Sequence, residues 1–382
     1  MRTAVCDMFG IEFPILAFTH CRDVVAAVTK AGGMGVLGAA GVSPHQLDID
    51  LRWIREEIGD RPFGVDVIVP AKYEGRDEGG LSWSKLQEMI PRAHRDFLED
   101  LLDRYEVPPL PADDPLMARA AEGRSSERAA PMTLNQAAGL LDVAFAHPIS
   151  LIANALGPPP PDMLSRAAER GVKVAALAGK KSHAVRHVAA GVDLIIAQGY
   201  EAGGHTGEIG TMVLVPEIVD AVAPVPVLAA GGIGRGRQMA AALTLGAEGV
   251  WCGSVWLTTE EAETHPTVKQ KFLAATSSDT LRSRSRTGKP ARQLRSAWTD
   301  EWEGPDSPGP LGMPLQPMLI EEASRRVDRA AHDPNAKAAQ LANYFVGQIV
   351  GDMNTVRPSR RVVLEMVEEF IDAMQRVEQM MR

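Results

Sequence analysis

Short apolar segments alternate with amphipathic or alanine-rich segments of helical length along most of the chain. The apolar segments are nearly continuous and rich in Val, Ile and Leu, which is typical of parallel strands that are buried on both faces. This pattern predicts eight strands: Phe13–Phe18, Met34–Ala39, Phe63–Val69, Ile149–Ala153, Val172–Leu177, Val192–Ala197, Val225–Ala230 and Glu248–Cys252.

Each predicted strand is followed, directly or after a longer loop, by a predicted helix. These helices are Arg22–Ala31, Pro44–Ile58, Leu134–Ala146, Asp162–Arg170, Ser182–Ala190, Val215–Val222, Arg237–Leu245 and Pro266–Ala275. Eight strand–helix units are the number found in a (β/α)8 TIM barrel, an α/β fold. An open, doubly wound sheet is the alternative, but no segment resembles an edge strand, so we expect a closed barrel.

Two regions interrupt this pattern and divide the chain. We expect the barrel to comprise residues 1–71 and 133–279, with a long insertion after strand 3 at residues 72–132. The insertion contains one predicted helix, Ser84–Tyr105, and we expect it to lie over the active-site face. Residues 280–382 are predicted to form a linker and a C-terminal helical extension, with a Pro-rich segment at Gly304–Pro317 and helices at Ala336–Val350 and Ser359–Met381.

Composition and charge narrow the functional class. The 40 basic and 49 acidic residues give a net charge of −9, which offers no electrostatic reason to expect nucleic acid or an anionic membrane as a partner. The three cysteines, Cys6, Cys21 and Cys252, lack CxxC spacing, so we expect neither a disulfide framework nor a metal site. No run of 18 apolar residues or signal peptide is evident, which favours a cytoplasmic protein.

The strongest candidate for chemistry is the segment QGYEAGGHTG at residues 198–207, which directly follows the sixth strand. Active sites of (β/α)8 barrels lie at the carboxyl ends of the strands. The glycines allow the backbone to approach a flat ligand, and they flank His205, a residue type suited to general acid–base catalysis near neutral pH. The run Gly33–Gly38 also fits GxGxxG, but it follows a helix and precedes a strand. We therefore interpret it as a tight turn and not as a nucleotide loop.

Two further loops indicate a phosphate-bearing cofactor. AAGGIG follows the seventh strand and WCGS follows the eighth. In many barrels these two loops bind phosphate through backbone N–H groups. Gly231, Gly232 and Gly253 are suited to expose such groups, and Ser254 adds a hydroxyl donor.

The run from Lys173 to Ser254, including EAGGH and AAGGI, closely resembles the nitronate monooxygenase (2-nitropropane dioxygenase-like) family. The resemblance implies an FMN-dependent TIM-barrel oxidoreductase, in a superfamily that also contains flavin-dependent enoyl-ACP reductases. It implies a catalytic role for His205. The cofactor-binding residues that it implies are Ala17, Phe18, Asp66, Lys173, Gln198, Ala202, Gly203, Gly204, Gly231, Gly232, Gly253 and Ser254.

The sequence departs from the family pattern at two of these places. Many members have Ala-Pro-Met and then Gly after the first strand, whereas this chain has Ala17-Phe18-Thr19-His20. An Asn is usual near the end of the third strand, where this chain has Asp66. An ionised carboxylate next to the flavin would disfavour the anionic reduced cofactor. His20 either reaches the pocket from the end of the first strand or has a surface or helix-entry role, and both interpretations stay open.

The resemblance leads to one main functional hypothesis and two alternatives. The main hypothesis is oxidation of nitronates or nitroalkanes by O2 to carbonyl compounds and nitrite. The first alternative is NAD(P)H-dependent reduction of enoyl thioesters or quinones, which the segment GEIGTM after His205 favours. The second is a flavin-binding or scaffold protein without activity. The basic run RSRSRTGKPARQLR at residues 282–295 is interpreted as a solvated surface, with contact to a phosphorylated ligand as the alternative, and the oligomeric state stays open.

Overall fold

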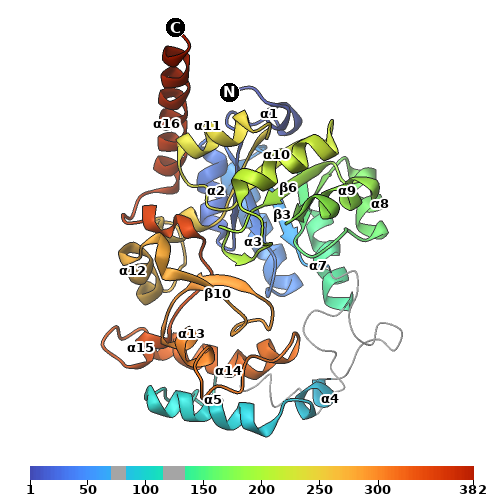
Figure 1. The fold of residues 1–382 in the computed structure, drawn as a ribbon. Coiled ribbons are helices and arrows are strands. Elements are labelled where there is room, and N and C mark those ends of the chain that lie inside the picture. The colour runs from blue at the N-terminus through green and yellow to red at the C-terminus, as the bar shows by residue number, and fades with distance from the viewer. Residues whose placement is uncertain (70–82, 115–133) are drawn as a thin grey trace.

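The computed structural model describes residues 1–69, 83–114 and 134–382, and within them the eight predicted strands form a closed parallel barrel (Figure 1). Around the barrel the order is β1-β2-β3-β4-β5-β6-β8-β9, and β9 pairs with β1 to close it. The strands are β1 (Ile15–Thr19), β2 (Met34–Gly38), β3 (Gly64–Val67), β4 (Leu151–Asn154), β5 (Lys173–Ala178), β6 (Leu194–Gln198), β8 (Val227–Ala230) and β9 (Gly249–Cys252). The (β/α)8 prediction is confirmed, and the open sheet is excluded.

Both faces of these strands are buried, which explains their continuous apolar sequences. One set of side chains, including Leu16, Met34, Leu194 and Trp251, fills the barrel interior. The alternating set, including Ile15 and Val65, packs against the surrounding helices. The short helix α1 (Ala4–Phe9) contributes Val5, Cys6 and Phe9 to the interior cluster.

Seven of the eight helices predicted for the barrel surround it, with small shifts in their ends: α2 (Arg22–Lys30), α3 (Pro44–Ile58), α7 (Leu134–Ala146), α8 (Pro161–Arg170), α9 (Lys181–Ala189), α10 (Thr211–Val222) and α11 (Gly236–Thr244). The eighth, α12 (Pro266–Ala274), packs in a second hydrophobic cluster instead, and the first half of α16 (Ser359–Met380) lies between α11 and α2. Helix α10 begins at Thr211, four residues before the predicted Val215. Its first N–H donates to the Glu201 carboxylate at 3.0 Å, a tertiary contact that sequence periodicity does not reveal.

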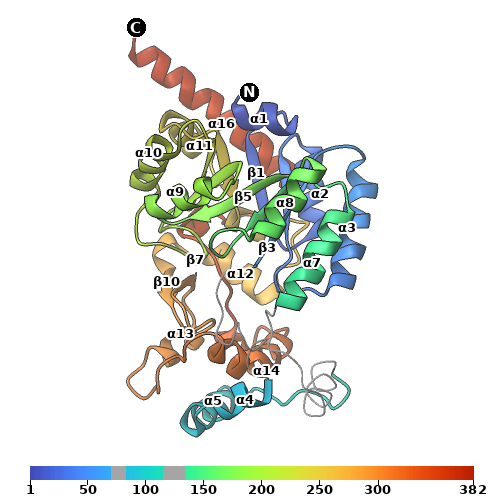
Figure 2. The ribbon, with the colours of Figure 1, turned by 90° about the vertical axis from the view of Figure 1, so that its right-hand side faces the viewer.

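A second hydrophobic cluster forms a cap below the barrel as drawn in Figure 1. Strands β10 (Thr280–Ser283) and β11 (Ala291–Leu294) form an antiparallel sheet with β7 (Gly204–His205). The cap also contains α13 (Ala297–Trp302), α14 (Leu315–Ala330) and α15 (Ala338–Leu341). Chain segments far apart in sequence therefore join at β7, between barrel and cap (Figure 2).

The described part of the insertion, residues 83–114, packs against the cap. The predicted helix Ser84–Tyr105 is two helices, α4 (Trp83–Glu88) and α5 (Arg92–Arg104), because Pro91 interrupts it and precedes α5. Both helices contact α14, which lies between α5 and the barrel (Figure 1). The rest of the predicted insertion lies outside the described residues.

The predicted helix Ala336–Val350 is wrong. Only α15 is helical at its start, and the 3-10 helix η4 (Gln348–Asp352) follows later. Between them Phe345 bridges to Gln293, and the Leu294 N–H donates to the Tyr344 carbonyl at 3.1 Å. Pairing with β11 thus overrides the local helical preference.

The final predicted helix is confirmed as α16 (Ser359–Met380). Within the described part of the chain, no helix combines the length and the apolar character needed to cross a membrane.

Candidate active site

The carboxyl ends of the strands bring several predicted site residues to one mouth of the barrel. Val65 and Val67 face the surrounding helices, so Asp66 between them faces the interior. The same alternation turns Gln198 inward, two residues after the interior residue Ile196. Phe18 packs against the interior cluster and stacks on Trp251, with ring centroids 5.9 Å apart.

Asp66 is the buried acid of this mouth. It is only 4% exposed, and the removal of solvent raises the pKa of its carboxyl well above the usual value. Burial therefore favours the protonated carboxyl, which donates one hydrogen bond. It opposes the ionised form that would disfavour a reduced flavin.

His20 lies beside the same mouth, at the end of β1, and its side chain is exposed. Its Nδ1 is 2.9 Å from the Gly38 carbonyl, and its ring meets the Phe18 ring edge-on with centroids 5.2 Å apart. A Cβ on Gly38 would lie 2.6 Å from His20 Cε1, so glycine makes the space for the ring. The removal of solvent around the ring lowers the pKa of His20.

His205 projects from the loop after β6, in the short strand β7. Its Nδ1 is 3.3 Å from the Pro290 carbonyl, and the removal of solvent around the ring, with the nearby Lys289 charge, lowers its pKa. A carbonyl oxygen can only accept a hydrogen bond, so the ring nitrogen that contacts it must donate. In the neutral imidazole this contact therefore favours the tautomer with the proton on Nδ1. Nε2 is then left with a free lone pair, and the His205 side chain is exposed.

Two arginines of the basic run hold the His205 loop from the cap side. Arg292 is 2% exposed and donates through Nε and Nη2 to the Tyr200 carbonyl at 3.2 and 3.1 Å. The Arg292 guanidinium also lies 4.4 Å from the centre of the Tyr200 ring. The second arginine, Arg282, donates to the Thr206 carbonyl at 3.3 Å. The interpretation of this run as a solvated surface is therefore wrong for Arg292. It is also wrong for Arg286, whose Nε donates to Asn343 Oδ1 at 2.7 Å.

The other side of the loop packs against the chain after Phe345. The Gln348 N–H donates to the Glu201 carbonyl at 2.9 Å. A Cβ on Gly203 would lie 2.8 Å from the Val346 carbonyl carbon, so only glycine fits this approach. Ala202 is buried beside it, whereas Gly204 has a φ of +72° and open space where a Cβ would be.

The loops after β8 and β9 have the features expected of a phosphate site. Within the described residues, the N–H groups of Gly231, Gly232, Gly253 and Ser254 have no hydrogen-bond acceptor. The nearest atom to a Cβ on Gly253 would be 3.7 Å away, on Phe18, so this position is open. The Ser254 hydroxyl accepts from the Gly347 N–H at 2.8 Å and can still donate to a ligand.

A separate groove of about 360 Å³ lies on the outer side of these loops, between α10 and α11. Gly231 and Gly232 contribute to its wall, but so do the carboxylates Glu201 and Asp352. These two acidic groups disfavour a phosphate in this groove, whereas no carboxylate lies near a Cβ placed on Gly253.

Two predicted cofactor residues do not belong to the mouth. Lys173 begins β5 at the opposite end of the barrel, where its Nζ pairs with Asp193 Oδ1 at 3.2 Å. Ala17 is fully buried and faces the surrounding helices, because its neighbours Leu16 and Phe18 face the interior. The structure therefore places both side chains away from the mouth, because the register decides which end and which face of the barrel a side chain occupies.

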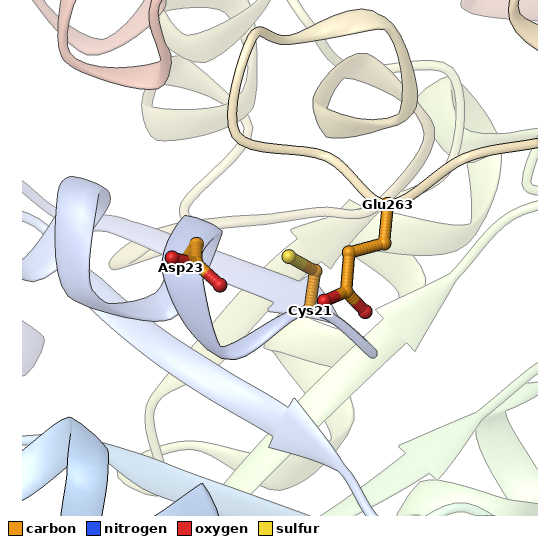
Figure 3. Close-up of side chains that lie close together, drawn as sticks. All are labelled: Cys21, Asp23 and Glu263. Atoms are coloured by element: carbon orange, nitrogen blue, oxygen red, sulfur yellow. The ribbon is translucent and has the colours of Figure 1, made fainter. Parts of the chain in front are cut away.

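Cys21, Asp23 and Glu263 form a thiol–carboxylate cluster beside the start of α2 (Figure 3). Cys21 Sγ donates to the Glu261 carbonyl at 3.1 Å, and burial raises the pKa of the thiol. A protonated thiol is a hydrogen-bond donor and a poor metal ligand. We therefore interpret the cluster as a link between α2 and the loop before α12.

Comparison with known proteins agrees with this geometry. The sequence model of the nitronate monooxygenase family matches residues 2–96 and 110–369. A Mycobacterium tuberculosis protein described as a monooxygenase is 62% identical over 374 residues, which cover 97% of both chains. A Staphylococcus aureus protein described as a nitronate monooxygenase is 26% identical over 378 residues, covering 93% of this chain and 98% of the relative.

Solved structures give the same result for the fold. A nitroalkane oxidase from Streptomyces ansochromogenes has a TM-score of 0.77 and 26% identity, and the match covers 98% of this chain and 100% of that one. FabK from Thermotoga maritima has a TM-score of 0.71 and 26% identity over 99% of both chains. The likeness extends through barrel and cap, and the matched proteins are enzymes. The chain therefore belongs to the nitronate monooxygenase family of flavin-dependent oxidoreductases.

Proposed function

We propose that this protein is an FMN-dependent enzyme that oxidises nitronates and nitroalkanes with O2 to carbonyl compounds and nitrite. The observation that carries the proposal is the position of His205, a neutral imidazole with a free Nε2 on the loop beside the barrel mouth. The relatives described as nitronate monooxygenase and nitroalkane oxidase support this substrate class.

The residues at the mouth fit FMN in particular. A single terminal phosphate needs several N–H donors at one place, and Gly231, Gly232, Gly253 and Ser254 supply them. The flat ring needs backbone without side chains, which Gly204 offers, together with the inward-facing Gln198. A bound FMN would supply the redox chemistry that links oxidation of the substrate to O2.

The side chains of the protein then have separate roles. His205 Nε2 removes the α-proton of a neutral nitroalkane, and the Pro290 carbonyl fixes the ring for that step. A preformed nitronate has already lost this proton and does not need the base. Burial raises the pKa of Asp66, and the protonated carboxyl that this favours would donate a hydrogen bond toward the ligand in the mouth.

The competing activity is NAD(P)H-dependent reduction of an enoyl thioester or quinone. The specific observation in its favour is the match to FabK, which has the same identity as the match to the nitroalkane oxidase but a lower TM-score. This activity would also use a flavin at the same mouth, so the fold does not separate the two reactions.

Product analysis separates them. The purified protein is incubated in air with a primary nitronate, and both nitrite and dissolved O2 are measured. In parallel it is incubated with NADH or NADPH and a crotonyl thioester, and nicotinamide absorbance is followed. Nitrite formation with O2 consumption supports the proposal, whereas nicotinamide oxidation without nitrite formation replaces it with the reductase.

A further inference from the structure

The C-terminal half of α16 extends away from the barrel without packing against it (Figures 1 and 2). The first half of the helix is anchored: Val362, Val363 and Met366 are buried. From Ile371 to Arg382 every residue except Ala373 is exposed. The free end therefore exposes apolar side chains that no other described residue covers.

The anchor holds the free end in a fixed direction. Glu369 accepts from Arg235 Nε at 2.9 Å and from the Gly236 N–H at 2.9 Å. A Cβ on Gly236 would lie 2.0 Å from the Met366 carbonyl oxygen, so α11 and α16 are in backbone contact at this point. The projecting turns therefore emerge from a rigid base and are preorganised for docking.

The exposed turns carry an apolar stripe with the spacing of a helix–helix seam. Apolar residues recur at alternating intervals of four and three from the buried base to the tip: Val363, Val367, Phe370, Met374, Val377 and Met381. Such spacing packs against another helix. Met374 and Val377 are 42% and 48% exposed, and Met380 and Met381 are 69% and 77% exposed.

We propose that the free end of α16 is an interface at which two copies of this chain associate through these stripes. The stretch from Ile371 to Arg382 contains two acidic and two basic residues, so its net charge is zero on a chain of net charge −9. Two copies thus meet at the part of the molecule where their mutual repulsion is weak. An anionic membrane fits less well, because the polar face lacks the excess of Lys and Arg that such binding uses.

The size of the stripe limits the strength of the association. Its exposed apolar side chains present on the order of 500 Å² per copy, so two copies bury about 1,000 Å², the lower limit for a specific interface. We therefore expect a reversible dimer with a dissociation constant in the micromolar range, about 1–100 µM. This inference does not depend on the proposed reaction.

Sedimentation velocity of the flavin-loaded protein between about 1 and 100 µM tests the interface. Wild type should shift from monomer toward dimer, and Val377→Glu should weaken dimerisation at least about tenfold, because the change places a charge in the apolar seam. Gln375→Glu adds the same charge to the opposite face of the same helix and should behave like wild type.

Two controls and two outcomes make this test decisive. Val377 and Gln375 are both exposed, so the circular dichroism and flavin spectra of the two variants should match those of wild type. Met374→Glu provides a second variant in the apolar stripe. A wild type that stays monomeric throughout the range overturns the proposal. So does a Val377→Glu protein that dimerises as strongly as Gln375→Glu.

Discussion

Replacing Asp66 with Asn removes a buried carboxyl at the mouth for which the described residues provide no charged partner. In the folded protein, burial raises the carboxyl pKa well above its usual value, whereas in the unfolded chain the pKa is about 3.9. Between these two values the folded state keeps a proton that the unfolded state releases. The free energy of unfolding of the wild type therefore falls as pH rises through this window.

The magnitude follows from one proton. Each pH unit within the window lowers the contribution of Asp66 by about 1.4 kcal/mol, starting near pH 4 and ending at the folded-state pKa. Asn has nearly the same shape and cannot ionise, so the variant lacks this loss. The difference in unfolding free energy, variant minus wild type, should rise by about 1.4 kcal/mol per pH unit and then level off.

Urea unfolding of both proteins at several pH values from about 4 to 8 measures this difference. All other titrating groups are shared and cancel in the subtraction. A change in flavin affinity shifts the difference by a constant but leaves its slope. If the difference is independent of pH across this range, Asp66 is ionised in the folded protein and the reasoning about the mouth is refuted.

Three other changes address the His205 loop. His205→Asn should keep the flavin but lower turnover of neutral nitroalkanes by about 10²–10⁴-fold, with less effect on nitronates; equal losses in steady-state rates would exclude the base role. For the wild type, the rate with neutral nitroalkane should rise as His205 deprotonates, with an apparent pKa below the usual histidine value. Arg292→Met leaves the Tyr200 carbonyl unpaired and should cost about 1–3 kcal/mol in urea unfolding, whereas exposed Arg284→Met should cost little. Gly203→Ala forces the loop from Val346 and should reduce flavin content measured by absorbance, unlike Gly312→Ala, where no atom lies within 4 Å of the added Cβ.

The barrel could be predicted because its signals are local. Each strand is a continuous apolar run followed by a helical period, and both depend on residues close in sequence. The glycine loops after β6, β8 and β9 could be placed for the same reason. Their position at the carboxyl ends of strands follows once the strands are known.

The errors involve contacts between distant segments. The chain near Phe345 pairs with β11, about 50 residues earlier, and this pairing replaces the expected helix. Burial of Arg292 depends on Tyr200, which is nearly 100 residues away. Helix α14 was missed because its first turn contains Pro317 within a Pro-rich stretch, although proline is tolerated in a first turn.

Register explains why two expected cofactor residues lie away from the mouth. Lys173 lies at the amino end of β5, and Ala17 has the wrong parity to face the interior. His20 lies beside the mouth because Gly38 on the neighbouring strand leaves room for it. The sequence shows both His20 and Gly38, but only strand pairing shows that they meet.

The central claim is that a flavin at this mouth takes electrons from a nitronate. Anaerobic stopped-flow absorbance of the purified yellow protein, mixed separately with a primary nitronate and with NADH, tests it directly. We predict rapid bleaching of the flavin by the nitronate and little bleaching by NADH. Rapid bleaching by NADH with none by the nitronate would contradict the account, and a colourless protein that does not take up FMN would refute it entirely.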